Sequence, residues 1–191
     1  LDSEITYGKL DNGFTYYIRE NQTPKDKVSI KLIIKTGSIM EEENQLGLAH
    51  LLEHMAFNGS KNFPKRKIDE YMSSIGLNLG SHYNATTGFL ETSYVYEIPT
   101  KNDKDVEIAL KILTDISKNL SFEPEAFERE RKIVEEEWRR DIGGTQDYVN
   151  EFHKVLFKNS RLNERKPIGT LDIIQNFKYQ DVIDYYQKWY R

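Results

Sequence analysis

Five consecutive residues, His-Leu-Leu-Glu-His from His50 to His54, constrain the fold of this chain more than any other segment. On a helix, residues four positions apart lie on the same face, so both imidazoles can point at one ion. Glu53 lies one step around the helix, where its carboxylate can accept a proton from water. The segment therefore predicts a helix that carries two zinc ligands, His50 and His54, with Glu53 as general base. The alternative is an ordinary helix in which one histidine is half-buried and Glu53 is solvated.

A second predicted helix, at residues 124–140, is the source we expect for a third ligand. Pro124 suits its first turn, and apolar residues recur at helical spacing along one stripe: Phe127, Val134 and Trp138. Glu130 and Glu137 lie on the same stripe, and burying a carboxylate is costly unless a cation or hydrogen bonds compensate. Acids on a core-facing stripe therefore indicate a metal nearby. We expect Glu130 to be the ligand and Glu137 to lie just outside the ligand set; an exposed charged run is the alternative.

Several strings, in order along nearly the whole chain, resemble the pitrilysin or insulinase family of zinc peptidases. The reversed order of the histidine motif is the inverzincin signature. The strings that carry the resemblance are Gly37-Ser38, Glu41-Glu42, Gly47-Leu48-Ala49, the motif followed by Met55, Phe57, Gly59 and Ser60, then Asn84-Ala85-Thr86-Thr87, Glu130-Arg131 with Glu137, Pro167-Ile168-Gly169-Thr170 and Lys188-Trp189-Tyr190.

The resemblance implies an activity and a role for each matching residue. The chain would be the catalytic part of a zinc metalloendopeptidase that hydrolyses extended or unfolded peptides, with one Zn²⁺ per chain. By this match the zinc ligands are His50, His54 and Glu130, the catalytic acids are the general base Glu53 and the supporting Glu137, and the substrate strand contains Asn84, Ala85 and Thr86. An exposed strand edge offers unpaired N–H and C=O groups to an extended peptide, which agrees with the implied strand role. An ordinary strand with a polar exposed face is the alternative.

The resemblance also implies that the chain is half of a larger peptidase. Residues 1–191 would form a single catalytic half-domain, the N-terminal part of an enzyme whose second, similarly folded half closes a chamber over the site. That half would come from the same chain or from a partner subunit, with a dimer as one arrangement, and the fragment alone would be weakly active or inactive. Two non-enzymatic alternatives are a scaffold of the same fold, which typically loses the motif, and a peptide-binding module whose zinc is structural and closed by four ligands.

Composition excludes several other classes of protein. The absence of cysteine rules out disulfides and thiolate zinc sites. A net charge of -4, with basic residues dispersed among acids, gives no reason to expect nucleic acid as a partner. No apolar run approaches the ~20 residues that span a bilayer, and no signal peptide is recognisable. The chain starts at Leu1 rather than Met, so we expect a processed protein or an excised piece, soluble in either the periplasm or the cytoplasm.

Hydrophobic periodicity predicts an α+β domain in which strands come first and helices follow. The turn signal Asp11-Asn12-Gly13 predicts a hairpin, and from Asp103 onward the pattern is helical, with breaks near Gly143-Gly144 and between residues 158 and 169. We therefore expect a largely antiparallel sheet with helices packed on one face. The expected strands are residues 5–10, 14–19, 28–35, 77–84 and 90–98, and the expected helices before residue 103 are 45–57 and 65–74.

Overall fold

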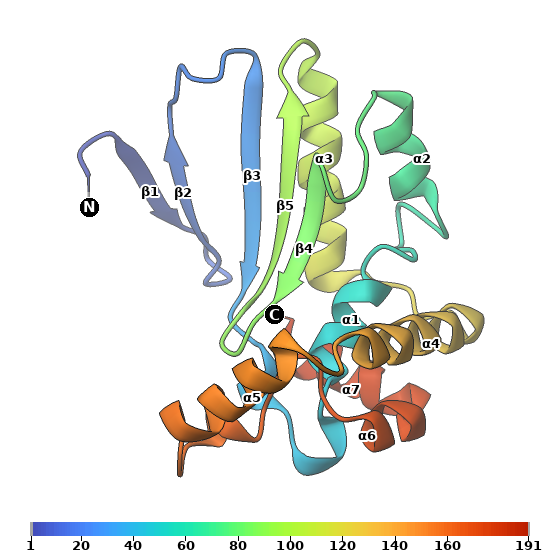
Figure 1. The fold of residues 1–191 in the computed structure, drawn as a ribbon. Helices are drawn as coiled ribbons and strands as arrows, with labels where there is room; N and C mark the ends of the chain where they lie inside the picture. Colours follow the sequence, from blue (N-terminus) through green and yellow to red (C-terminus); the bar gives the residue numbers. More distant parts are fainter. Residues whose placement is uncertain (1, 191) are drawn as a thin grey trace.

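The fold combines antiparallel strands with helices, which confirms the predicted class (Figure 1). The computed structural model describes residues 2–190, apart from the side chains of residues 145 and 146. Its strands are β1 (Ile5–Lys9), β2 (Thr15–Arg19), β3 (Lys27–Ile34), β4 (Tyr83–Thr87) and β5 (Thr92–Pro99). Its α-helices are α1 (Leu48–Met55), α2 (Lys67–Ser74), α3 (Asp103–Lys118), α4 (Pro124–Arg140), α5 (Thr145–Leu156), α6 (Leu171–Asn176) and α7 (Tyr179–Trp189).

The strands form two antiparallel sheets. β1 and β2 make a hairpin, and the other three strands are ordered β3-β5-β4, so β5 is central and β4 lies at an edge. Side chains alternate along β3: Leu32 and Ile34 are buried, whereas Lys31 and Ile33 are exposed. α3 packs against β3 and β5 and covers their buried face (Figure 1). The outer edge of β4 is left unpaired by every strand that the structure describes.

Helix α1 lies between the three-stranded sheet and the helices α4 and α7 (Figure 1). It contacts α4, α7 and β4, and four of its apolar side chains have no exposed surface: Leu48, Leu51, Leu52 and Met55. Burying such a side chain stabilises the fold by roughly 1.5–3 kcal/mol. Because these residues anchor one side of the helix, the adjoining face carries His50 and His54 toward α4.

Some predicted boundaries differ from the structure. The motif helix begins at Leu48 rather than at residue 45, because Gly47 takes a left-handed backbone (φ 97°) after a short 3-10 turn. The strand predicted at residues 77–84 was wrong: β4 begins only at Tyr83, since positive φ values at Gly76 (80°) and Gly80 (86°) turn the chain first. The predicted helix at residues 124–140 agrees with α4, and a short break at residues 119–123 separates it from α3.

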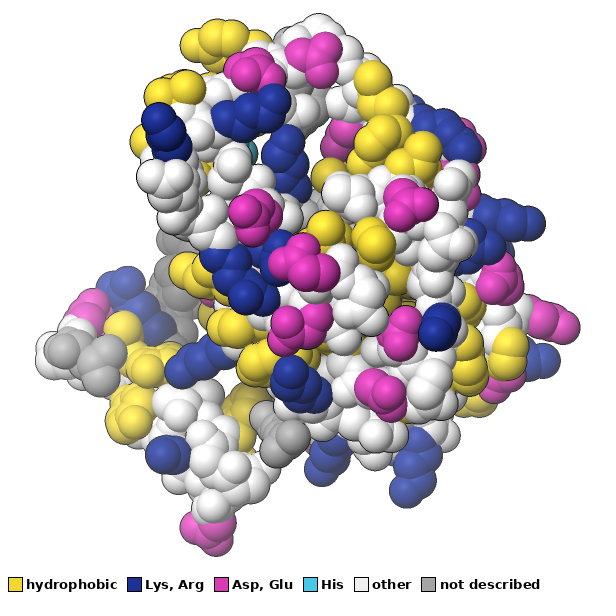
Figure 2. Space-filling model, turned by 90° about the horizontal axis from the view of Figure 1, so that it is seen from below, with side chains coloured by type: hydrophobic (Ala, Val, Ile, Leu, Met, Phe, Trp, Pro, Cys, Tyr) yellow, Lys and Arg dark blue, Asp and Glu magenta, His cyan; other side chains and the backbone are white. Residues whose placement is uncertain are grey.

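Charged and apolar side chains share the molecular surface. In the face seen in Figure 2, acidic and basic side chains are interspersed, as their dispersal in the sequence predicts. On α5, large apolar side chains at helical spacing form an exposed stripe: Tyr148, Phe152, Val155 and Leu156. Among the described residues, no helix is both long and apolar enough to cross a membrane.

Candidate metal centre

The two motif histidines face each other across one turn of α1. Nε2 of His54 lies 3.3 Å from Nε2 of His50, and the two rings stand nearly perpendicular at 88°. Both side chains are only about one-fifth exposed, at 19% for His50 and 17% for His54. The motif helix therefore places two imidazole nitrogens at one point of the surface, as its spacing predicts.

Helix α4 brings both predicted glutamates to these histidines. Oε2 of Glu137 lies 3.4 Å from Nε2 of His54 and 3.7 Å from Nε2 of His50. Ligand atoms of the three residues all lie within 4.8 Å of one another. Oε2 of Glu130 instead lies 3.4 Å from Nδ1 of His54, the other ring nitrogen. Both acids are at the site, but they approach it from different sides.

The expectation that Glu130 is the third ligand stays a prediction, and the position of Glu137 makes it a second candidate. The carboxylate that shares the space in front of both Nε2 atoms belongs to Glu137, which was expected outside the ligand set. The two glutamates are about two helical turns, or ~10 Å, apart along α4, yet each places a carboxylate oxygen 3.4 Å from a ring nitrogen of His54. Their common stripe predicted that both would face α1, but it could not tell which acid would be level with the nitrogens.

The group fits a zinc ion by the chemistry of its donors. Two imidazole nitrogens and one carboxylate oxygen are a ligand set that catalytic zinc sites use, with a further position open. Zinc-ligating histidines commonly donate their other N–H to a carboxylate, and Glu130 lies where it could accept that hydrogen from Nδ1 of His54. Arg129 in turn pairs with Glu130 at 3.4 Å and also contacts Asn58. These two supporting residues were not predicted from the sequence.

The electrostatic surroundings of the two histidines differ. Burial lowers the pKa of His50 to about 4, with a smaller contribution from repulsion by His54. The His50 imidazole is therefore neutral at pH 7. Burial also lowers the pKa of His54, but the neighbouring carboxylates of Glu130, Glu137 and Glu53 outweigh burial and raise the pKa overall. The ring of His50 is therefore neutral and able to bind a cation at pH 7, whereas the acidic neighbours of His54 favour its protonated form.

Glu53 is a buried carboxyl group fixed by the end of β4. It is 8% exposed, and Oγ1 of Thr87 donates a hydrogen bond to its Oε2 at 2.5 Å. Burial raises its pKa, with a smaller rise from Glu137, while Thr87 and His54 act in the opposite direction. Thr87 was not predicted as a site residue, although it ends the Asn84–Thr87 string that singled out this strand. The contact joins that string to the histidine motif.

A pocket of about 1260 Å³ opens over these residues. Its walls include the histidines, the three glutamates and, from the edge strand, Asn84. Of the three predicted substrate residues, only Asn84 lines this pocket. Ala85 is buried in the core, and the Thr86 hydroxyl pairs with that of Ser93 at 3.0 Å. Side chains of β4 therefore reach the pocket at one position, beside an edge whose backbone is unpaired among the described strands.

A reversed histidine motif on one helix, glutamates from a second helix and the edge of an antiparallel sheet together define an inverzincin-type metallopeptidase domain. Comparison with known proteins agrees with this class. The family model for insulinase, peptidase family M16, matches residues 16–165. The chain therefore belongs to the insulinase family, M16.

Relatives in this family are named as zinc proteases. The probable zinc protease PqqL of Haemophilus influenzae is 38% identical over 191 residues, which are 100% of this chain and 21% of that protein. The crystal structure of the periplasmic protease PqqL from Escherichia coli matches with a TM-score of 0.96 and 36% identity, over 100% of this chain and 21% of that one. A crystal structure of the first half of the same protease matches equally well, and the chain covers 41% of it. The chain thus spans about a fifth of the full-length relatives.

Proposed function

We propose that this chain is the catalytic half-domain of a zinc-dependent metalloendopeptidase that cuts extended peptides. The observation that carries the proposal is the convergence of ligand atoms from His50, His54 and Glu137 beside the buried carboxyl group of Glu53. An open three-ligand site with an adjacent base suits hydrolysis, whereas a structural zinc is closed by four ligands. The complete motif also argues against an inactive scaffold.

The proposed site exchanges the roles first expected for the two glutamates. His50, His54 and Glu137 would hold one zinc ion, and Glu130 would accept the Nδ1 hydrogen of His54. That hydrogen bond would fix the tautomer whose lone pair is on Nε2 and would orient the ring. When bound, zinc supplies Lewis acidity, which lowers the pKa of water to about 7 and polarises a carbonyl group.

Glu53 is proposed to move the proton during hydrolysis. The Thr87 hydroxyl engages one of its carboxylate oxygens, which leaves the other to accept a proton from the attacking water and to deliver it to the leaving amine. A pKa raised by burial suits this exchange, because the group then binds a proton at a pH closer to neutral.

The substrate is proposed to lie along the outer edge of β4. Backbone groups of an edge strand can pair with any extended peptide, so this mode selects for unfolded conformation rather than for one side chain. Asn84 lines the pocket and Thr87 contacts Glu53, so a peptide on this edge would pass the base. Ala85 and Thr86 would contribute through their backbone groups.

A second half-domain of similar fold is proposed as the partner. The full-length relatives are about five times as long as this chain, and the exposed stripe on α5 offers apolar surface that another domain could cover. Without that half, a peptide would be held on one side only. Because positioning of the scissile bond supplies several kcal/mol of the barrier reduction, the chain alone should turn over slowly.

Cleavage of an unstructured peptide tests the proposal. We expect slow cleavage by the purified chain, loss of cleavage after a chelator removes the metal, recovery with zinc, and a faster rate when the second half is supplied in the same chain or as a subunit. Cleavage that survives metal removal would contradict the zinc mechanism. Equal rates with and without the second half would refute the half-enzyme interpretation. Peptide binding without cleavage by the complete protein would favour a binding module.

A further inference from the structure

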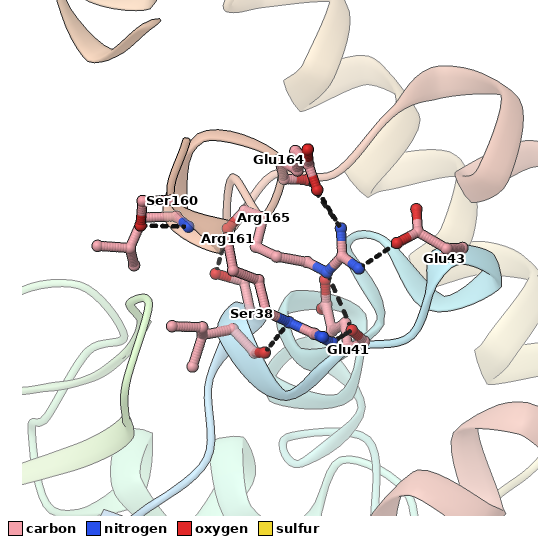
Figure 3. Close-up of polar contacts among 9 residues, drawn as sticks. Ser38, Glu41, Glu43, Ser160, Arg161, Glu164 and Arg165 are labelled. Carbon is pink, nitrogen blue, oxygen red and sulfur yellow. Dashed lines mark hydrogen bonds and ion pairs between the residues drawn. The ribbon is translucent and has the colours of Figure 1, made fainter. Parts of the chain in front are cut away.

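Two segments far apart in sequence meet just ahead of the motif helix. We call this group the clasp and define it by five residues, which Figure 3 shows together: Ser38, Glu41, Glu43, Arg161 and Arg165. Glu41 and Arg165 are 124 positions apart. Both are almost completely buried, at 0% and 2% exposed. Burying charged groups is costly unless they are paired. Burial raises the pKa of Glu41 to about 8, although its backbone hydrogen bonds and Arg165 act in the opposite direction.

The side chain of Glu41 caps the N-terminus of α1. One carboxylate oxygen accepts a hydrogen bond from the Gly47 N–H at 2.9 Å, and the other accepts one from the Ala49 N–H at 2.8 Å. The first N–H groups of a helix have no partner within the helix, and a carboxylate there is also favoured by the helix dipole. Ala49 directly precedes His50. The cap therefore fixes the backbone of the turn that carries the first motif histidine.

Two arginines hold the backbone of Glu41 in place. Nε of Arg165 donates to the Glu41 carbonyl oxygen at 3.0 Å, and Nη2 of Arg161 donates to the same oxygen at 2.6 Å. Arg165 also pairs with the Glu43 carboxylate, and its own carbonyl oxygen accepts a hydrogen bond from Ser38 at 2.5 Å. The clasp thus secures Glu41 from both sides, through contacts that include no metal-site residue.

We propose that Glu41 and Arg165 are positioning residues that set the orientation of α1, and through it the zinc affinity of His50 and His54. The inference rests on the proposed function, because it assumes that the two histidines bind zinc. Hydrophobic burial already anchors one side of α1. Burial alone leaves the helix free to shift or rotate slightly, whereas two directed hydrogen bonds at its first turn do not. Small displacements matter because both nitrogens must reach one ion.

The test compares Glu41→Gln with a matched control, Asp115→Asn. Asp115 is also a buried carboxylate, 1% exposed. It accepts hydrogen bonds from Ser60, Asn62 and Asn119, none of which lies in α1. Both variants exchange a buried carboxyl group for an amide. Zinc affinity is measured by competition with a chelator, at a temperature where circular dichroism shows each protein folded, and the visible spectrum of the Co²⁺-loaded protein reports ligand geometry.

We expect Glu41→Gln to weaken zinc binding roughly 10–100-fold, the range seen when groups supporting metal ligands are lost, and to alter the Co²⁺ spectrum. Asp115→Asn should lower the thermal midpoint but keep the affinity and the spectrum. Equal zinc affinity in wild type and folded Glu41→Gln would overturn the proposal. If the wild type bound no zinc at all, the proposed function would fail instead, so the two failures are distinguishable.

A second variant and a measurement on the wild type cover the case in which Glu41→Gln does not fold. Arg165→Lys keeps the charge but loses the planar group that engages Glu41 and Glu43 together, so it should also weaken zinc binding. In the wild type, if the Glu41 hydrogen bonds favour zinc binding, linkage requires zinc binding to stabilise those hydrogen bonds in turn. Zinc should therefore slow hydrogen exchange at the Gly47 and Ala49 amides. Unchanged exchange at both amides on zinc binding would count against the clasp as a positioning device.

Discussion

The carboxylate of Glu130 lies 3.4 Å from Nδ1 of His54, the ring nitrogen that does not face His50. An acceptor at Nδ1 keeps the hydrogen there and leaves the lone pair on Nε2, which points to the space shared with His50 and Glu137. In the proposed site, Glu130 would therefore act through the orientation and basicity of His54.

The proposed exchange of roles between the two glutamates predicts unequal effects on metal binding. Glu137→Gln removes a ligand, so most zinc should be lost when the protein is dialysed against a weak chelator. Glu130→Gln removes only the support of His54, and the zinc affinity should fall roughly 10–100-fold with the site still fillable at high zinc. Zinc content by atomic absorption and a competition titration measure both. The opposite order, with Glu130→Gln losing the metal and Glu137→Gln keeping it, would show that Glu130 is the ligand, as first predicted.

The proton-transfer role of Glu53 can be separated from metal binding. Glu53→Gln keeps the size and one hydrogen-bond acceptor but cannot take a proton, so the rate of peptide cleavage should fall by about 10²–10⁴ while zinc stays bound. His54→Ala is the comparison and should lose both zinc and cleavage. Metal content and initial rates of the same preparations give the answer. A Glu53→Gln variant that cleaves at nearly the wild-type rate would rule out this base.

The pKa values of the two histidines predict how zinc binding depends on pH. In the metal-free protein the raised pKa of His54 adds stability that is present below its ordinary value of 6.5 and is lost as pH rises through the raised value. Zinc must displace that proton, so affinity should rise with pH through this window and release a proton from His54. His50, with a pKa of about 4, should release none.

Calorimetry in two buffers of different ionisation enthalpy measures this proton release. Glu130→Gln is the control, because removing one of the carboxylates that raise the pKa of His54 should reduce the protons released at the same pH. Zinc affinity that falls as pH rises from 6 to 8, or heats that are identical in both buffers at pH 6, would contradict proton release from His54.

Gly169 is predicted to be irreplaceable because of both its backbone and its neighbours. Its φ is +75°, and a Cβ built on it would lie 2.2 Å from the carbonyl oxygen of Leu46, just ahead of α1. Gly13 has a φ of +89° but nothing within 4 Å, so Gly13→Ala is a matched control for the backbone cost alone. We expect Gly13→Ala to lose about 1–2 kcal/mol of unfolding free energy and Gly169→Ala clearly more. Urea unfolding measures the free energy lost in each variant. Equal losses would show that the close approach of Gly169 to the Leu46 carbonyl oxygen adds no further cost.

Local patterns in the sequence predicted the parts of the site that depend on one helix at a time. The spacing of His50 and His54 predicted their common face, and the stripe through Val134 predicted that Glu130 and Glu137 would both point inward. Which acid faces the Nε2 atoms of both histidines depends on the position of α4 along the axis of α1. Periodicity holds no information on that position, so the choice between Glu130 and Glu137 as the third ligand stays a prediction.

Contacts between segments far apart in the sequence could not be predicted from local patterns either. Glu41 was noted only as part of a family string, because nothing local shows that Arg165 would meet it. Thr87 was read as part of a strand, since the position of Glu53 beside that strand exists only in the folded chain. The displaced start of β4 has a local cause: Gly80 could have signalled a turn, but the polar residues around it also suit an exposed strand.

Anomalous diffraction at the zinc absorption edge, from crystals of the zinc-loaded protein, tests the central claim most directly. The account predicts a single strong peak per chain, about 2.0–2.1 Å from Nε2 of His50 and of His54 and about 2.0–2.2 Å from a carboxylate oxygen of Glu137. Glu130 should remain beside Nδ1 of His54. A peak coordinated by Glu130 instead of Glu137, or the absence of any peak between the two histidines in a zinc-saturated crystal, would contradict the proposed metal centre.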